Sequence, residues 1–268
     1  MIVEQKMKNM INKVQVNIPF RMLFETFLDQ FLQLGLNPEI GFDALALEEF
    51  SVKDYRPIAA KLHQKSLRIT LHGPFIDLSV GSADPGIRAL TRKRFEQVLE
   101  LIPLFKPQTL ICHAGYDKRR YGFFRDVWIE RSLACWSWLA DRLEDTGTRL
   151  MLENVYEDGP ADIRILFEEL TSKNVGFCLD TGHLTAFGQA SLEEWLTVME
   201  PYIGQLHLHD NNGDWDDHLE LGGGAIDFKH LFAYLKHTRK HPPIVTLEPH
   251  QEAHLFPSLE YLAQHWPW

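Results

Sequence analysis

The amino-acid sequence predicts an α/β fold in which a single domain, residues 1–268, forms a (β/α)8 barrel. Short apolar, strand-like runs alternate with longer helix-like segments about eight times, the order expected of a parallel sheet with crossover helices. Most of these runs end in His, Asp or Glu, and the longest connections follow the C-terminal ends of predicted strands. Active sites of such barrels form on that face, and 268 residues is a usual length for one barrel.

Six of the strand-like runs end in side chains that commonly bind metals. They are ITLHGPF with His72, LICHAG with His113, LMLEN with Glu153, FCLDTGH with Asp180 and His183, QLHLHD with His207 and His209, and IVTLEPH with Glu248. Two weaker members, VQVNIPF with Asn17 and NPEIGF with Glu39, open the series. Side chains alternate between the two faces of a strand, so residues two positions earlier, such as Thr70, Met151 and Thr246, share the face of the polar residue. We therefore expect the polar side chains to converge at one end of the barrel.

The segments between the strands have helical periodicity and recognisable ends. RMLFETFLDQFLQLG is expected to form one helix that ends at Gly35, a usual residue for a C-terminal cap. Asp84-Pro85 opens a second helix, since Asp is a favoured N-cap and Pro is tolerated at the first helical position. DVWIERSLACWSWLADRLEDTG is expected to end at Gly147, and SLEEWLTVMEP, DFKHLFAYLKHT and SLEYLAQHW complete the set.

An open, doubly wound sheet is the structural alternative to a closed barrel. That fold usually carries a glycine-rich phosphate loop after its first strand, and the segment VQVNIPFRM contains no glycine. The barrel is therefore preferred.

Composition limits the class of protein. Hydrophobic residues make up 45% and charged residues 24% of the chain, values usual for a globular protein. The net charge of −10 makes a nucleic-acid partner unlikely, because such proteins usually present a basic face. Three separated cysteines favour reduced thiols, and the N-terminal segment resembles neither a signal peptide nor a membrane span. We expect a cytoplasmic protein without a membrane partner.

Four of the strand-end residues form the simplest metal site. Glu153, Asp180, His207 and Glu248 follow four consecutive strands and would meet over one half of the barrel mouth. Three carboxylates and one imidazole suit a divalent ion such as Mn²⁺, Mg²⁺ or Co²⁺, and Zn²⁺ also fits.

The ordered series HGPF, CHAG, LEN, LDTGH, HLHDN, DDHLELGGGAID and LEP resembles the xylose isomerase-like TIM barrel superfamily. This superfamily holds sugar and sugar phosphate isomerases and epimerases together with endonuclease IV. The resemblance extends from VQVNIPF to the last helix. It implies a TIM barrel and two alternative metal-dependent activities.

Similarity to the isomerase and epimerase branch implies a single ion and a small sugar or sugar phosphate as substrate. In that branch the residues that match Glu153 and Glu248 also move protons on the two faces of a bound keto sugar, through an enediolate. They would be the catalytic residues here. Asp180 and His207 would be ligands only.

Similarity to the endonuclease IV branch implies a trinuclear zinc phosphodiesterase that acts on abasic-site DNA or another phosphoester. The matching ligands are His72, His113 and Glu153 for one ion; Glu153, Asp180, His207 and Glu248 for a second; and His183, Asp216 and His218 for the third. All nine ligand types are present. The sequence nevertheless favours the isomerase or epimerase, because the chain is acidic and compact and has His209 where the endonucleases have another residue.

Several further residues are candidates for substrate contact. Glu39 and Asn17 lie in phase with the site and are expected to bind sugar hydroxyls, and Trp215 in a rim loop could stack on a sugar. Arg119, in the loop after His113, could meet a substrate phosphate, although a solvated surface loop is the slightly favoured interpretation. Helical tryptophans 128, 136 and 138 are expected to pack between helices, and an oligomer contact there is possible. A barrel that binds a metal without catalysis is a third class of function.

Overall fold

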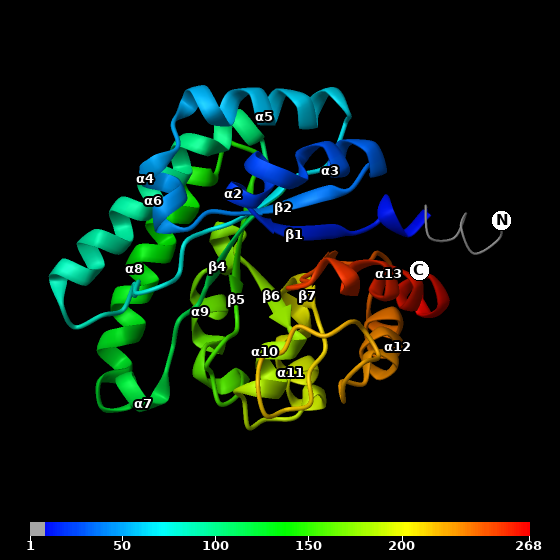
Figure 1. Ribbon diagram of the computed structural model, residues 1–268. Helices are drawn as coiled ribbons and strands as arrows, with labels where there is room; N and C mark the ends of the chain where they lie inside the picture. Colours follow the sequence, from blue (N-terminus) through cyan, green and yellow to red (C-terminus); the bar gives the residue numbers. More distant parts are fainter. Residues whose placement is uncertain (1–8) are drawn as a thin grey trace.

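The predicted barrel is confirmed by the computed structural model, which describes residues 9–268 (Figure 1). Eight parallel strands in these residues close in sequential order, with β1 hydrogen-bonded to both β2 and β8. The strands are β1 Gln15–Pro19, β2 Asn37–Gly41, β3 Thr70–His72, β4 Thr109–His113, β5 Arg149–Glu153, β6 Gly176–Asp180, β7 Ile203–Leu208 and β8 Ile244–Leu247. Residues 1–8 of the predicted domain lie outside the described part of the chain.

Helices surround the barrel on its outer side (Figure 1). The α-helices are α2 Phe20–Met22, α3 Leu28–Leu34, α4 Ala44–Glu49, α5 Val52–Gln64, α6 Pro85–Phe105, α7 Lys118–Tyr121, α8 Arg125–Leu143, α9 Arg164–Glu169, α10 Thr181–Ala186, α11 Leu192–Met199, α12 Phe228–Thr238 and α13 Leu255–His265. A π-helical turn covers Leu23–Phe27, and short 3₁₀ turns cover Gly122–Phe124, Pro160–Asp162, Thr171–Lys173, Glu200–Tyr202 and Glu252–His254. Among residues 9–268, no helix combines the length and apolarity needed to cross a membrane.

The local signals at helix ends explain several of these boundaries. The Asp84 side chain accepts a hydrogen bond from the backbone N–H of Gly86 at 2.7 Å, as expected for an N-cap before Pro85. Gly35 has φ 72° and caps α3, also as predicted. Ends of this kind are encoded by single residues, so the sequence identifies them well.

Two predicted helices differ from the structure. The segment that begins at Arg21 is not one α-helix, because the π turn interrupts it. Leu23 and Leu28 are both buried although they are five residues apart, a spacing that a π turn places on one face. The helix predicted to end at Gly147 stops at Leu143, whose carbonyl accepts hydrogen bonds from both the backbone N–H and the hydroxyl of Thr146.

The core has two layers. A large cluster lies between the strands and the surrounding helices and contains the outward-facing strand residues, among them Leu71, Leu152 and Leu247. A separate small cluster inside the barrel consists of Ile111, Met151 and Cys178, the residues two positions before His113, Glu153 and Asp180. This alternation confirms that the polar strand ends share the inner face.

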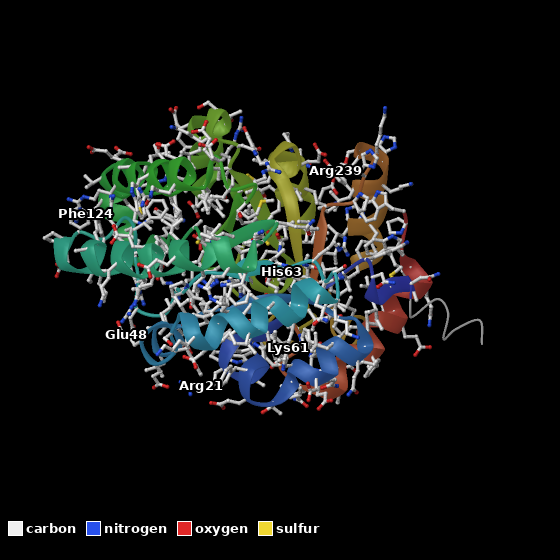
Figure 2. All side chains as sticks on the ribbon, turned by 90° about the horizontal axis from the view of Figure 1, so that it is seen from above. Arg21, Glu48, Lys61, His63, Phe124 and Arg239 are labelled. Atoms are coloured by element: carbon white, nitrogen blue, oxygen red, sulfur yellow. The ribbon has the colours of Figure 1, made fainter. Side chains whose placement is uncertain are left out.

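The expectations for the cysteines and for two of the helical tryptophans agree with the structure. Cys112, Cys135 and Cys178 are free thiols, and the first and last of them are buried. Trp128 and Trp136 are fully buried between elements. On the outer surface, Glu48 pairs with Arg94 and Arg239 pairs with Glu200 (Figure 2).

Gly81 in the β3–α6 connection makes a close approach to α8. A Cβ atom at this position would lie 2.2 Å from Cδ1 of the buried Trp128. We expect Gly81→Ala to destabilise the protein by about 1–3 kcal/mol, since an overpacked core must shift. Urea unfolding followed by tryptophan fluorescence would measure the loss.

Gly122→Ala provides the matched control, because its Cβ would meet only Lys118 at 3.7 Å, an ordinary contact. Equal stability of the Gly81→Ala variant and the unmodified protein would show that α8 has room to move.

Candidate metal centre

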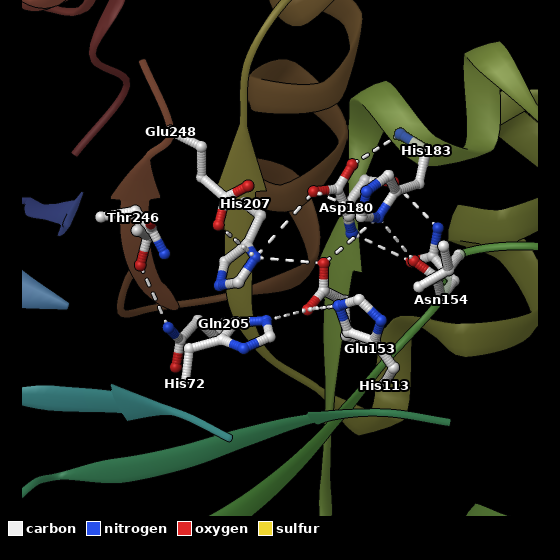
Figure 3. Close-up of polar contacts among 12 residues, drawn as sticks. His72, His113, Glu153, Asn154, Asp180, His183, Gln205, His207, Thr246 and Glu248 are labelled. Carbon is white, nitrogen blue, oxygen red and sulfur yellow. Dashed lines mark hydrogen bonds and ion pairs between the residues drawn. The ribbon is translucent and has the colours of Figure 1, made fainter. Parts of the chain in front are cut away.

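Strand register brings the predicted ligands to one rim. His113 pairs in register with Glu153, and Asp180 pairs with His207. His72 ends β3, and Glu248 directly follows β8. Six consecutive strands therefore place one ligand-type side chain each at the same end of the barrel (Figure 3).

Glu153 lies at the centre of this group. Its Oε2 is 3.1 Å from Nε2 of His72 and 3.6 Å from Nε2 of His113. Its Oε1 is 3.2 Å from Nδ1 of both His183 and His207. The two carboxylate oxygens thus face two different pairs of histidines, as the dashed lines of Figure 3 show for this group.

His207 faces three carboxylates through one ring nitrogen. Its Nδ1 lies 3.0 Å from Glu248 Oε1, 3.2 Å from Glu153 Oε1 and 3.9 Å from Asp180 Oδ2. All four side chains are buried, and Glu248 is the one with the most exposed surface. This is the four-residue set that the sequence predicts for a single ion.

The loop after β7 contributes a third group. Asp216 Oδ2 lies 3.1 Å from Nε2 of His218 and 3.5 Å from Nε2 of His183. The structure therefore brings His183, Asp216 and His218 together next to the other six residues. All nine residues that the endonuclease IV resemblance implies occupy one site.

Backbone carbonyls fix the orientation of three histidines. Nδ1 of His72 lies 2.9 Å from the carbonyl of Gly73, and Nδ1 of His218 lies 2.8 Å from that of Glu248. Nδ1 of His183 lies 3.0 Å from the carbonyl of Asn154. A carbonyl only accepts, so each Nδ1 carries the proton in these contacts and each Nε2 presents a lone pair to the carboxylates. Histidine ligands of metals are oriented in this way.

The ends of β5 and β6 are held together by Asn154. Its side-chain nitrogen donates to the carbonyl of Asp180 at 2.9 Å, and its side-chain oxygen accepts from the N–H of Asp180 at 2.9 Å. Asp180 also caps α10 by accepting from the N–H of His183 at 2.6 Å. These bonds fix the spacing between Glu153, Asp180 and His183.

The electrostatics of the group favour ionised carboxylates. Burial raises the pKa of Glu153, but His207, His113 and His183 outweigh it and hold that pKa well below the usual value. Burial likewise opposes ionisation of Glu248 and Asp216, and the neighbouring histidines lower both pKa values. Negative charge is therefore retained in a site with little water.

The pKa values of the histidines in the site are shifted in two directions. Burial lowers the pKa of His183, but the charge of Asp180 and hydrogen bonds to Asp216 and Glu153 raise it well above the usual value. Burial lowers the pKa of His113 to about 3, because the charge of Glu153, which raises this pKa, offsets the effect of burial only in part. His113 is thus a neutral imidazole, the form that binds metals.

The residues present fit a divalent metal centre. Both ring nitrogens of His207 are buried and make no hydrogen bond of acceptable geometry to any described residue. Overlapping groups of three ligand-type residues have their ligand atoms within 4.8 Å of one another, among them His72, His113 and Glu153, and Glu153, Asp180 and His207. Imidazole and carboxylate together suit Zn²⁺, Mn²⁺ and Co²⁺.

A cavity of about 500 Å³ opens above the site. Its floor includes His72, His113, Glu153, His183, Asp216, His218 and Glu248, and its walls include Phe75, Ile76, Val155, Tyr156, Phe187 and His250. Arg21, which pairs with Glu25 and Glu49 at the surface, is the lining residue with a permanent positive charge (Figure 2). The size is that of a small-molecule site.

The structure places the predicted substrate residues differently. Glu39 is fully buried inside the barrel below the cavity, whereas Asn17 lines the cavity. Trp215 is 68% exposed and the Arg119 side chain is 80% exposed, and neither lines the cavity. His209 is buried, with Nε2 3.3 Å from Asp180 Oδ2.

Several residues of the site were not predicted from the sequence. Phe75 stacks on His113 with ring centres 4.2 Å apart. His250 stacks on His218 at 3.4 Å, and His218 in turn stacks on His209 at 3.7 Å. Both residues are the last residues of quoted runs, ITLHGPF and IVTLEPH, and their closeness to the strand end was the available signal.

The family model for the xylose isomerase-like TIM barrel matches residues 38–265 of the chain, which include every ligand-type residue described above. The chain belongs to the xylose isomerase-like TIM barrel family. The predicted resemblance is thereby confirmed.

Two relatives that are similar in sequence to this chain have different names. The chain is 29% identical over 177 residues to the uncharacterized protein MJ1311 of Methanocaldococcus jannaschii, a match that spans 63% of this chain and 60% of that protein. It is 28% identical over 193 residues to a Mycobacterium bovis protein named "Probable endonuclease 4", covering 68% of this chain and 73% of the relative.

Solved structures of similar fold include one from a zinc-soaked crystal. The TTHB071 protein of Thermus thermophilus, soaked with ZnCl2, is 27% identical, with a TM-score of 0.76 over 94% of this chain and 98% of that one. A D-tagatose 3-epimerase-like protein is 22% identical with a TM-score of 0.76, over 94% and 97% of the two chains, and shares the fold.

One buried carboxyl group of this barrel lies near the ligands without contacting them. Glu157 is 1% exposed and accepts hydrogen bonds from the N–H groups of Tyr116 at 3.0 Å and Val155 at 2.6 Å. Burial raises its pKa from 4.5 to about 7, although the backbone N–H groups lower it. The folded protein therefore binds this proton more tightly than the unfolded chain.

This contribution to stability is complete below pH 4.5 and is lost as the pH rises through about 7. We expect the unmodified protein to lose up to about 3 kcal/mol of stability relative to Glu157→Gln over that window. Urea unfolding of both proteins at several pH values, with the same metal content, would measure the difference. A difference that does not depend on pH would contradict the raised pKa.

Proposed function

We propose that this protein is a metal-dependent phosphoesterase whose centre holds more than one divalent ion. The observation that carries the proposal is the position of Glu153, whose Oε2 faces His72 and His113 and whose Oε1 faces Nδ1 of His207. A carboxylate in such a position can bridge two ions. A single-ion site has no use for His72 and His113.

The charge of the site supports the same conclusion. Five carboxylates, Glu39, Glu153, Asp180, Asp216 and Glu248, lie among the histidines and carry five negative charges when ionised. One divalent ion would leave an excess of about three negative charges in a buried site, and three ions would leave about one positive charge. A site with a small positive excess attracts a phosphoester, and one with a large negative excess repels it.

Bound divalent ions would supply Lewis-acid chemistry, polarising a phosphoryl oxygen and activating water as the nucleophile. The chain orients His72 and His183 through backbone carbonyls and holds His113 as a neutral imidazole. Glu248 is the most exposed of the four predicted single-ion ligands and lines the cavity, so in that set its carboxylate is the group placed to accept a proton from an incoming water. Phe75 and Tyr156 line the cavity with aromatic side chains.

The cavity sets the size of the substrate. About 500 Å³ accommodates a nucleotide or a sugar phosphate, and the aromatic walls offer faces for stacking. A nucleic acid could enter only with one nucleotide turned out of its helix. The 28% identical relative named "Probable endonuclease 4" gives a reason to include abasic DNA among the substrates tested.

The number of bound ions tests the proposal directly. We expect about three Zn²⁺ per chain in protein purified without chelator, measured by elemental analysis. His218→Ala should remove about one ion and should lower the hydrolysis of bis(p-nitrophenyl) phosphate at least tenfold, since Nε2 of His218 faces Asp216 of the third group. His230→Ala is the matched control, because His230 lies on the surface and pairs with Glu193.

About one ion per chain, together with unchanged metal content in His218→Ala, would contradict the multinuclear centre. Three ions with no activity toward small phosphodiesters, phosphomonoesters or an abasic oligonucleotide would contradict the phosphoesterase.

Isomerisation or epimerisation of a small sugar or sugar phosphate is the second candidate function. Two observations favour it: the cavity has the size of a sugar site, and Glu153 and Glu248 both approach Nδ1 of His207, at 3.2 and 3.0 Å. In that reaction one of the two carboxylates would remove a proton beside a carbonyl and the other would return it. That reaction with a single ion gives no role to His72, His113 and His218, which places this function second.

A panel of keto sugars and their phosphates in heavy water tests the second candidate. We expect no incorporation of deuterium at carbon if the protein is a phosphoesterase. Incorporation by the unmodified protein, abolished in Glu153→Gln and Glu248→Gln and retained in His218→Ala, would establish the isomerase or epimerase instead.

A further inference from the structure

Glu39 on β2 is a buried carboxylate that no ligand prediction uses. It is 0% exposed and lies inside the barrel, below the ring of ligands. Its Oε1 is 3.0 Å from Nε2 of His207, the ring nitrogen opposite the one that faces Glu153 and Glu248. His207 therefore lies between Glu39 on one side and the proposed metal centre on the other.

Neutral donors from several strands hold Glu39 in place. Its Oε2 accepts hydrogen bonds from the hydroxyls of Thr70 and Thr246, each at 2.9 Å, and from Nε2 of Gln205 at 2.6 Å. Its Oε1 also accepts from Nδ2 of Asn17 at 3.3 Å. With its own strand, the carboxylate is tied to β1, β2, β3, β7 and β8.

The orientation of Gln205 is itself determined. The hydroxyl of Thr109 on β4 donates to Oε1 of Gln205 at 2.7 Å, so the amide nitrogen of Gln205 must point toward Glu39. Every group that faces Oε2 is thus a donor. A carboxylate can only accept hydrogen bonds, so it satisfies all of these donors. A side-chain amide in its place would direct its own N–H donors at another donor on one side.

This network favours one tautomer of His207 when a cation binds. Nε2 lies 3.0 Å from Oε1 of Glu39, so with a cation at Nδ1 the imidazole proton would lie on Nε2, toward that carboxylate. Nδ1 is the nitrogen that faces three carboxylates. Those contacts become favourable when a cation lies between the lone pair and the oxygens.

We propose that Glu39 is a positioning residue that fixes the tautomer and ring orientation of His207 and thereby sets the affinity of the metal centre. The proposal depends on the metal centre of the proposed function but not on which reaction the centre performs. Glu39 takes the role that backbone carbonyls take for His72, His183 and His218. It differs from them by adding a full negative charge behind the ligand.

Zinc affinity of the Glu39→Gln variant is the first test. We expect its weakest-bound zinc to be held about 10- to 100-fold less tightly than in the unmodified protein, measured by competition with a chromophoric chelator. Glu157→Gln is the matched control, since it changes another buried glutamate that contacts no ligand, and its zinc affinity should not change. Unchanged affinity in Glu39→Gln would overturn the proposal.

A spectroscopic measurement separates positioning from a general loss of structure. In zinc-loaded protein with 15N-labelled histidine, a long-range 1H–15N spectrum should show His207 with its proton on Nε2, assigned by its disappearance in His207→Gln. Glu39→Gln should shift or broaden that signal while those of His72 and His218 stay in place. An unchanged His207 signal would contradict the role of Glu39.

Milder variants keep the test open if Glu39→Gln does not fold. Thr70→Val and Thr246→Val each remove one donor to Oε2 and conserve volume closely. The double variant should lower zinc affinity severalfold and leave hydrolytic activity at saturating zinc nearly intact. Unchanged affinity in a folded double variant would also overturn the proposal. Loss of hydrolysis with normal affinity in every variant would instead concern the proposed function alone.

Discussion

The concentration of negative charge at one rim of the barrel is the constraint on which the rest of the site depends. Carboxylates removed from water are stable only when cations or donors surround them. This protein surrounds Glu153 with four histidine rings and holds Asp180 at a helix N-terminus. The same carboxylates need divalent cations to be fully balanced, so the fold and the metal chemistry share one electrostatic requirement.

Much of the site follows from periodicity in the sequence. A strand shows every second residue on one face, and a closed barrel brings the C-terminal ends of its strands to one rim. These two rules were enough to predict that Glu153, Asp180, His207 and Glu248 lie together. The inner layer of Ile111, Met151 and Cys178 follows from the same alternation.

The parts that were not predicted depend on depth and on loop conformation. Glu39 has the correct phase, but phase reveals the face of a strand and not the height of a residue within the barrel, so its contact with His207 could not be foreseen. Trp215 lies in a loop, where no repeating geometry fixes the direction of a side chain. Arg119 lies in the short helix α7, which the sequence analysis expected to be a loop. The stacking of His250 on His218 has the same origin, since both residues lie beyond the strand ends.

Because their ligands come from six consecutive strands, the proposed ions would contribute to the stability of the whole barrel. Each ion would join strand ends that are far apart in the chain, and Glu39 would extend that connection through His207 to β1 and β2. Since an unfolded chain has no such site, the free energy of binding would add to that of folding by mass action. The melting temperature would then be a property of the protein and the free ion concentration together, and chelation would loosen the barrel from its rim downward.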